Sequence, residues 1–197
     1  MILVDKVKHL MADWQLGRMR RRVESVTLSF PDDLRKPKHV LVLLPPGLRE
    51  LTLVKQFLPS INQLFKPADV SLLSTPGVRV HDIYPRKGFQ ILAPTMEQLT
   101  WSGIPKKTYI QNLRDQKFDA LLDLNLEPQH FTSAILLSFP KAVRIGRGNQ
   151  LGDPYYNLEI KTKYLRDERN IYRSLFETLG FLLNRPLDGA RPAPSRN

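Results

Sequence analysis

The sequence has no cysteine and no long apolar run, and both absences restrict what the protein can be. Without cysteine it forms neither a disulfide nor a thiolate metal site, a composition that fits a cytoplasmic protein. No apolar stretch reaches the roughly 18 residues that a membrane-spanning helix needs. The N-terminal segment interrupts its apolar residues with charges, so we expect neither a transmembrane segment nor a signal peptide.

Several motifs that mark enzymes are also missing. The sequence contains neither a Walker phosphate loop nor the G-x-S-x-G turn of hydrolases. The glycines of IGRGNQLG lack the spacing of a dinucleotide loop, although Arg147 among them is a candidate anion ligand. The histidines form no close pair with one another, so we expect no metal ion and no cofactor. They are His9, His39, His81 and His130.

Positive charge is abundant. The formal net charge is +11 and the isoelectric point is near 10.0, which indicates an anionic partner such as phosphate, nucleic acid or membrane lipid. The basic residues do not interleave with aromatic residues on a predicted strand, so nucleic acid is the less favoured of these partners. One local cluster is a candidate contact to a membrane or another anion. It consists of Arg18, Arg20, Arg21 and Arg22.

The stretch from Phe118 to Gly146 predicts a βαβ unit. Phe118–Leu124 is a short apolar run with a carboxylate near each end, as in a strand of a parallel sheet. Phe131–Phe139 has the apolar spacing of a helix that lies on a sheet, and Pro140 ends it. Ala142–Ile145 predicts the second strand, and Gly146–Pro154 a loop.

An earlier stretch predicts the opening half of a Rossmann-like domain. His39–Leu44 and Asp69–Ser74 have the composition of strands, and Leu48–Phe65 between them carries a helical apolar face. Pro59 lies inside that helix and should kink or split it. We therefore predict an α/β fold with a mainly parallel sheet flanked by helices.

The remaining segments complete the predicted domain. Further strands are expected at Val80–Tyr84, Phe89–Ala93 and Tyr156–Lys161, and helices at Pro105–Lys117 and Leu165–Leu183. Residues 1–38 form an N-terminal extension of a helix and a connector with a short extended piece at Val26–Phe30. Residues 39–183 form the domain. Residues 184–197, rich in proline and arginine, predict a disordered tail.

The N-terminal extension allows two interpretations. Residues 2–24 predict an amphipathic helix with Leu3, Val7, Leu10 and Trp14 on one stripe. Followed by the arginine cluster, such a helix suits an anionic membrane surface. The same stripe also suits a helix that packs on the domain or on a partner, with its arginines in water.

Ligands of such sheets bind beyond the carboxyl ends of the strands. In this sequence those positions are near Leu124–His130 and Gly146–Gly152. Asn125 and His130 are therefore candidate ligand contacts. Glu127 is three residues from His130, but Pro128 lies between them in a predicted loop, which does not give helical metal-ligand geometry.

Four stretches in order resemble a known family. They are HVLVLLPPGLRELTLVKQFLPSINQLFKPADVSLL, KFDALLDLNLE, SAILLSFPKAVRIG and RNIYRSLFETLGF. Together they resemble the N-terminal half of glycosyltransferase family 9, the heptosyltransferase-like enzymes of lipopolysaccharide assembly. The resemblance covers residues 39–183 and implies one half of a two-domain GT-B fold, the half that holds the acceptor. The donor-binding half has no counterpart, which implies that this chain is not a transferase on its own.

The resemblance also implies site residues in the first loop. The family has Gly-Asp there, with the aspartate as base for the acceptor hydroxyl, whereas this sequence has Arg49 and Glu50. Glu50 keeps a carboxylate one methylene longer, and Arg49 replaces a glycine that permits close backbone approach. Gly47 and Arg49 are candidate ligand contacts and Glu50 a candidate base. The alternative is that Arg49 and Glu50 simply begin a solvated helix.

Three hypotheses follow for function. The first is a non-catalytic binding or scaffold protein in envelope polysaccharide assembly, cytoplasmic or at the inner face of the membrane. It would bind an anionic saccharide, a membrane surface or a partner transferase. The second is a glycosyltransferase that works only with a separate donor domain or as a homo-oligomer. The third is a basic nucleic-acid-binding module, whose affinity would fall steeply with salt.

Overall fold

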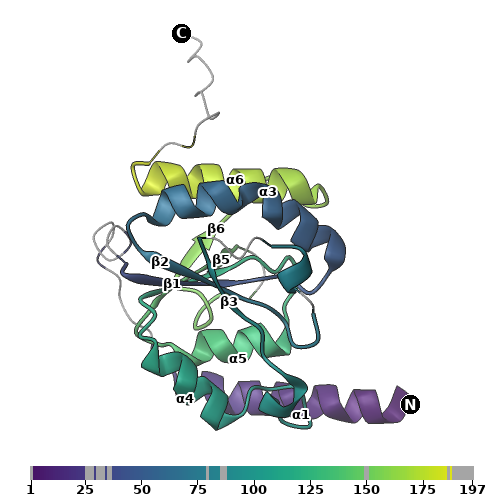
Figure 1. Cartoon of the computed structure of the whole chain (residues 1–197). Helices are drawn as coiled ribbons and strands as arrows, with labels where there is room; N and C mark the ends of the chain where they lie inside the picture. Colours follow the sequence, from purple (N-terminus) through teal and green to yellow (C-terminus); the bar gives the residue numbers. More distant parts are fainter. Residues whose placement is uncertain are drawn as a thin grey trace.

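The computed structural model describes residues 2–24, 29, 34, 37–78, 80–84, 88–148, 151–185 and 187. In this part of the chain a parallel sheet is flanked by helices on both faces (Figure 1). The strands are β1 (His39–Leu43), β2 (Asp69–Leu73), β3 (Gln90–Leu92), β4 (Ala120–Asp123), β5 (Val143–Arg147) and β6 (Leu158–Ile160). The helices are α1 (Ile2–Arg20), α3 (Leu48–Phe65), α4 (Lys107–Asp115), α5 (His130–Ser138) and α6 (Glu168–Leu182), with the short 3-10 turns η1 (Val80–Asp82) and η2 (Met96–Gln98).

The strand order is β3-β2-β1-β4-β5-β6, and every described pair is parallel. The chain starts in the middle of the sheet, builds outward to β3, and then crosses to the other side of β1 to form β4, β5 and β6. This is the order of a doubly wound Rossmann-like domain, and it places the topological switch point between β1 and β4. The predicted α/β fold is confirmed.

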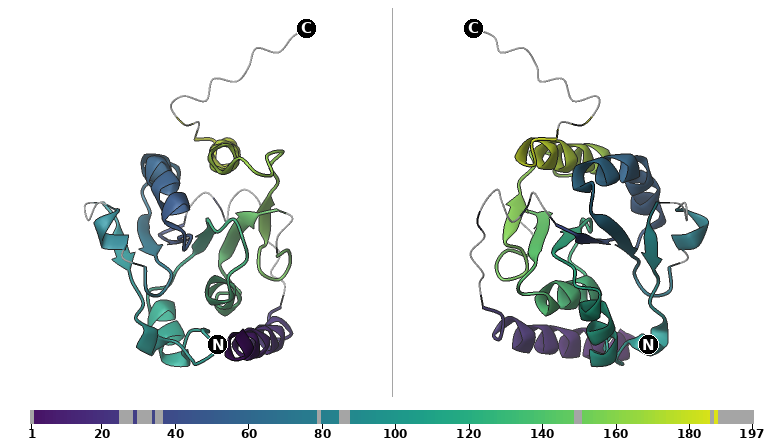
Figure 2. Two further views of the ribbon diagram at one scale, coloured as in Figure 1. Left: turned by 90° about the vertical axis from the view of Figure 1, so that its right-hand side faces the viewer. Right: turned by 60° about the vertical axis from the view of Figure 1, so that its left-hand side comes forward.

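The sheet is the middle of three layers. Helices α3 and α6 cover one face, and α5 covers the other, with α1 and α4 beneath it (Figures 1 and 2). Side chains of β1 alternate between the two cores: Val40 and Val42 pack under α3 and α6, whereas Leu41 and Leu43 pack with α5. Burial on both faces explains why the strands are continuously apolar in sequence.

Helix α3 buries the apolar face that its sequence predicts. Leu51, Val54, Leu58 and Ile61 are buried at intervals of three and four residues. The helix continues through Pro59, so the predicted split near this residue does not occur. Its neighbour α6 packs alongside, with the rings of Phe57 and Phe176 stacked at 5.1 Å between centroids.

Three local predictions are wrong. Val80–Tyr84 contains the turn η1 rather than a strand, and its Tyr84 hydroxyl reaches into the core to donate to the Leu51 carbonyl at 2.8 Å. Gly146 and Arg147 belong to β5 rather than to a loop, because they pair with β6. His130 is the first residue of α5 rather than a loop residue.

Two predicted segments fall largely outside the described residues. Of the extended piece Val26–Phe30 only Ser29 is described, and of the predicted tail only Asn184, Arg185 and Leu187. Arg185 donates to the Leu64 carbonyl at 2.7 Å, which fastens the end of α6 to the end of α3. Among the described helices, none is long and apolar enough to cross a membrane.

Candidate functional site

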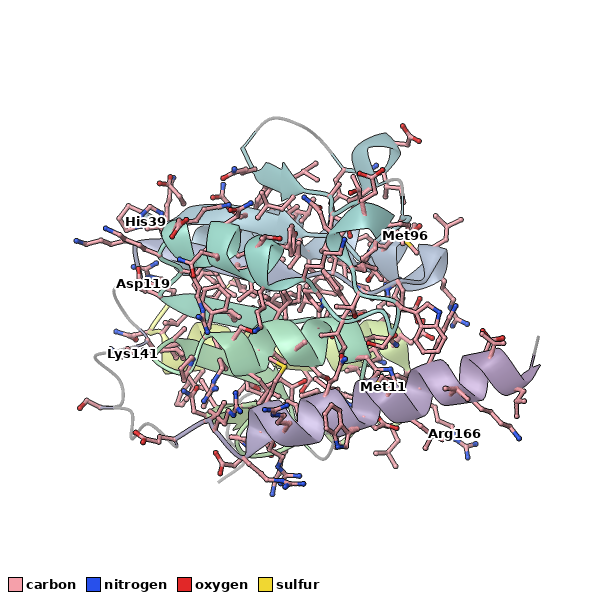
Figure 3. All side chains as sticks on the ribbon, turned by 90° about the horizontal axis from the view of Figure 1, so that it is seen from below. Met11, His39, Met96, Asp119, Lys141 and Arg166 are labelled. Atoms are coloured by element: carbon pink, nitrogen blue, oxygen red, sulfur yellow. The ribbon has the colours of Figure 1, made fainter. Side chains whose placement is uncertain are left out.

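The candidate site lies at the carboxyl edge of the sheet, where β1 and β4 end side by side. Leu43 and Asp123 are register partners at these ends. From here the chain leaves β1 towards α3 on one face and leaves β4 towards α5 on the other. His39 and Asp119 mark the opposite, amino edge, and Met96 lies on the carboxyl side (Figure 3). In doubly wound sheets, ligands bind beyond this edge at the topological switch point.

Asp123 is the centre of this edge. Its side chain is only 3% exposed. One carboxylate oxygen accepts from the Asn125 backbone N–H at 3.0 Å and from Asn125 Nδ2 at 2.6 Å, and the other accepts from the Tyr156 hydroxyl at 2.7 Å. Burial raises the pKa of Asp123, and these hydrogen bonds oppose the rise. Asp123 thus fixes the start of the loop that follows β4.

Tyr156 reaches this carboxylate from the segment before β6. Its ring lies against Gly146, where any side chain would overlap it. Burial and the neighbouring Asp123 both raise the pKa of Tyr156, so the hydroxyl stays protonated and acts as a donor. The contact closes the carboxyl ends of β4 and β5.

Asn125 is held firmly but incompletely satisfied. It is 3% exposed, and its Nδ2 and backbone N–H both donate to Asp123. Its side-chain oxygen is buried and has no hydrogen-bond partner in the described part of the chain. The structure therefore offers a fixed, unused acceptor at the predicted ligand position.

Tyr172 fixes the same loop from the other face of the sheet. Its hydroxyl donates to the Leu124 carbonyl at 2.9 Å. Burial raises its pKa, and the negative charges of Glu50 and Glu168 raise it further. The carboxylates of Glu50 on α3 and Glu168 on α6 therefore lie close enough to Tyr172 to act on it electrostatically.

Glu50 and Arg49 occupy the first turn of α3. The Glu50 carboxylate folds back over Gly47, the N-cap residue, into the space that a side chain at Gly47 would fill. A negative charge at this position is stabilised by the helix dipole. Arg49 turns away from Glu50, and its Nε lies 3.1 Å from a carboxylate oxygen of Glu168 on α6. The two neighbours thus serve different contacts.

His130 connects the carboxyl edge to α1. Its Nε2 lies 2.8 Å from a carboxylate oxygen of Asp13, and its ring centroid is 5.3 Å from that of His9. This candidate ligand contact is therefore engaged in docking the N-terminal helix. Sequence reasoning missed the pairing because His130 and Asp13 are 117 residues apart.

The predicted site residues share an edge without forming one cluster. Gly47, Arg49, Glu50, Asn125, His130 and Arg147 all follow or end strands at the carboxyl side. No hydrogen bond or ion pair joins any two of them in the part that the structure describes. The residues that organise the edge are Asp123 and Tyr156, which sequence reasoning did not select. Asp123 gave a signal as a carboxylate that ends an apolar strand, whereas Tyr156 gave none.

The arginine cluster lies at the end of α1. Arg20 donates from Nη2 to the Asp153 carbonyl at 3.3 Å, and the Arg18 guanidinium lies 5.9 Å from the Trp14 ring centroid. Arg21 is exposed, and Arg22 lines a groove beside α4. The cluster is thus on the side of the sheet that α1, α4 and α5 cover, away from α3 and α6 (Figure 1).

A buried arginine stands out on β5. Arg144 is fully buried, and none of its three guanidinium nitrogens has a hydrogen-bond partner among the described residues. Burial lowers its pKa, while the charge of Asp153 opposes that change. Its backbone N–H donates to the Asn157 side chain at 2.6 Å. A desolvated cation of this kind contributes little to stability.

We expect replacement of Arg144 by methionine to leave the free energy of unfolding unchanged or to raise it by about 1–2 kcal/mol. Methionine keeps most of the volume and removes a charge that burial disfavours. Urea unfolding of both proteins measures the difference. A loss of stability above about 2 kcal/mol would contradict the expectation and would mean that an anion accompanies the guanidinium.

Across the described residues, no three side chains of histidine, aspartate or glutamate gather as ligands of a metal ion would. Comparison with known proteins then places the chain. A family model described as a family of unknown function, DUF6913, matches residues 31–182. The chain belongs to this family. No curated protein matches the sequence.

Solved structures resemble this DUF6913 chain in fold. The E. coli heptosyltransferase WaaC with ADP superposes with a TM-score of 0.52 at 14% identity, over 81% of this chain and 49% of that chain. A family 9 glycosyltransferase from Veillonella parvula DSM 2008 gives 0.51 at 14% identity, over 74% of this chain and 42% of that chain. The DUF6913 chain thus spans about half the length of the enzymes that it matches. The predicted relation to one half of a GT-B transferase is confirmed at the level of the fold.

Proposed function

We propose that this DUF6913 protein binds an anionic saccharide at the carboxyl edge of its sheet and does not transfer sugar itself. Its role would be that of a binding or scaffold protein in envelope polysaccharide assembly. The observation that carries the proposal is the state of the two carboxylates at this edge. Glu50 is folded over Gly47 at the start of α3, and both oxygens of Asp123 already accept hydrogen bonds. A general base has to face the hydroxyl that it deprotonates.

The same edge has the chemistry to bind a phosphorylated saccharide. The Arg49 side chain is 79% exposed and can approach an anion while its Nε remains beside Glu168. Asn125 offers a buried acceptor without a partner in the described residues, which suits a sugar hydroxyl. Asn125 stands on a loop that buried tyrosines hold, and Arg49 stands on the first turn of α3, so the backbone that carries both groups is ordered before a ligand binds.

A thermal-shift titration tests the proposal with three ligand classes: phosphorylated monosaccharides, free nucleotides and nucleotide sugars. A ligand that binds only the folded state adds about 2.7 kcal/mol to the free energy of unfolding when its free concentration is a hundred times Kd. The melting temperature rises as a result. We expect a shift with phosphorylated saccharides only. Arg49→Gln should reduce that shift, and Arg173→Gln, an exposed arginine on α6, should leave it unchanged.

Glu50→Gln separates the proposal from the transferase alternative. We expect this variant to keep both the ligand-induced shift and the function in the host, because the carboxylate serves the helix N-terminus. A shift with nucleotide sugars, together with sugar transfer that Glu50→Gln abolishes, would contradict the proposal. That result would establish an enzyme completed by a separate donor domain or by a second copy.

A further inference from the structure

Helix α1 carries apolar side chains on two opposite sides. The side that faces α5 docks it to the domain, with Ala12 and Leu16 buried at 0% and 6% exposure. Asp13 adds its contact to His130 on the same side. The predicted stripe of Leu3, Val7, Leu10 and Trp14 is therefore not what holds this helix to the protein.

The outer side of α1 is apolar and exposed. Six large apolar residues lie there, at exposures between 41% and 75%. They are Leu3, Val4, Val7, Leu10, Met11 and Trp14, and we refer to them as the outer stripe. Figure 3 looks onto this part of the molecule, with α1 in the foreground and Met11 labelled. Monomeric proteins rarely expose a continuous apolar surface of this kind unless it binds something.

Both tryptophans of the protein are exposed on or beside α1. Trp14 is 60% exposed on α1, and Trp101 is 59% exposed in the segment before α4. Lys8 of α1 lies 5.8 Å from the Trp101 ring centroid, so Trp101 lies beside this helix. Tryptophan is usually well buried in a folded protein, but it is enriched at membrane–water interfaces.

A cationic groove runs beside the outer stripe. It has a volume of about 700 Å³ between α1, α4 and α5. Its lining includes four basic side chains and no carboxylate among the described residues. The basic residues are Arg18, Arg22, Lys107 and Arg114, and Trp14 and Ile110 add apolar walls.

We propose that α1 attaches this protein to an anionic membrane surface. The outer stripe and Trp101 enter the interface between headgroups and acyl chains, and the groove accepts a lipid phosphate. No described helix can span a membrane, so α1 lies along the surface in the manner of a peripheral amphipathic helix. The attachment does not depend on which ligand binds the carboxyl edge.

Charge favours a membrane over a second copy of the chain as the occupant. A two-fold dimer through the outer stripe would bring two cationic grooves to one interface, where like charges repel. The lining offers no carboxylate to compensate them. Anionic lipid headgroups supply the missing negative charge across the whole surface.

Vesicle co-sedimentation tests the proposal on the full chain. We expect binding to phosphatidylcholine vesicles that contain phosphatidylglycerol, and much weaker binding to phosphatidylcholine alone. The tryptophan emission should shift to shorter wavelength on binding, since Trp14 and Trp101 are the only tryptophans. The single variants Arg18→Gln and Arg22→Gln should each reduce the affinity for these vesicles about 5-fold.

Matched variants distinguish vesicle binding through the outer stripe from nonspecific adsorption through other exposed side chains. Leu10→Ser combined with Val7→Ser should reduce vesicle binding at least about tenfold. Phe181→Ser, at the most exposed large apolar residue of α6 on the opposite face of the sheet, should leave binding unchanged, as should Arg173→Gln. Circular dichroism checks that each variant is folded.

Three outcomes would overturn the proposal. The first is absence of binding to anionic vesicles. The second is binding that the double stripe variant does not weaken. The third is a dimer of the wild-type protein, measured by light scattering, that Val7→Ser and Leu10→Ser convert to a monomer, because the stripe would then be an interface between copies.

Discussion

Replacing Gly146 with valine is expected to lower the free energy of unfolding by about 3–5 kcal/mol. A side chain at this position of β5 would overlap the ring of Tyr156. The ring cannot move aside without withdrawing its hydroxyl from the buried carboxylate of Asp123, 2.7 Å away. The cost therefore combines overpacking of the core with a broken buried hydrogen bond. Urea unfolding monitored by circular dichroism measures the difference.

Gly17 supplies the matched control for this prediction. It lies inside α1, and a side chain there would meet no atom within 4 Å. Gly17→Ala should therefore raise the stability of the helix by about 0.5–1 kcal/mol. If Gly146→Val unfolded at the same urea concentration as the wild type, the packing of Tyr156 against β5 would be refuted.

Combining Gly146→Ala with Tyr156→Ala should cost less than the two single changes added together, because both act on one contact.

The second large effect is expected from Asp123→Ala. The change leaves three buried donors without an acceptor: the Asn125 N–H, its Nδ2 and the Tyr156 hydroxyl. An unsatisfied buried donor costs about 1–3 kcal/mol, so the total loss should reach about 3–5 kcal/mol. The loop after β4 should also become mobile, which amide hydrogen exchange at Asn125 detects.

Asp119, the residue immediately before the same strand, is the control. Its carboxylate is exposed and accepts from the backbone N–H groups of Lys38 and His39 at 2.7 and 3.1 Å. Water can replace these hydrogen bonds, so Asp119→Ala should cost about 1 kcal/mol. Equal losses at Asp119 and Asp123 would contradict the assignment of Asp123 as the centre of the edge.

The pH dependence gives Asp123 a further signature. Its pKa in the folded protein is raised above the ordinary 3.8, so the folded state holds the proton more tightly than the unfolded chain does. This contribution to stability is complete below the ordinary pKa and is lost as the pH rises through the folded-state value. The unfolding free energy of the wild type minus that of Asp123→Asn should therefore decrease with rising pH. An increase of this quantity with pH would mean that the hydrogen bonds from the three donors outweigh burial.

The fold was predictable because its signals are local. The apolar strands and the face of α3 follow from burial on two sides of a parallel sheet, and each is visible within a short window of sequence. The turn at Val80–Asp82 was not, since Tyr84 is drawn into the core by the Leu51 carbonyl, more than thirty residues away in sequence. Local propensity carries no information about such a partner.

The candidate site was predictable only in its location. Strand ends identified the carboxyl edge and Asn125, but the pairing of Asp123 with Tyr156 and of His130 with Asp13 depends on how distant segments pack. The N-terminal helix shows the same limit. Its periodicity revealed an apolar stripe, but the docking side depends on Ala12, whose small side chain lets α1 approach α5 closely.

The two faces of the sheet have a practical consequence for labelling. Helix α1 lies beneath α5, whereas α6 lies on the opposite side of the sheet (Figure 1). The end of α6 is fastened there through Arg185 to the Leu64 carbonyl. An affinity tag or fluorophore joined beyond Leu187 therefore starts from the side of the molecule away from α1. One joined before Ile2 would stand on the outer stripe itself and compete with whatever that surface binds.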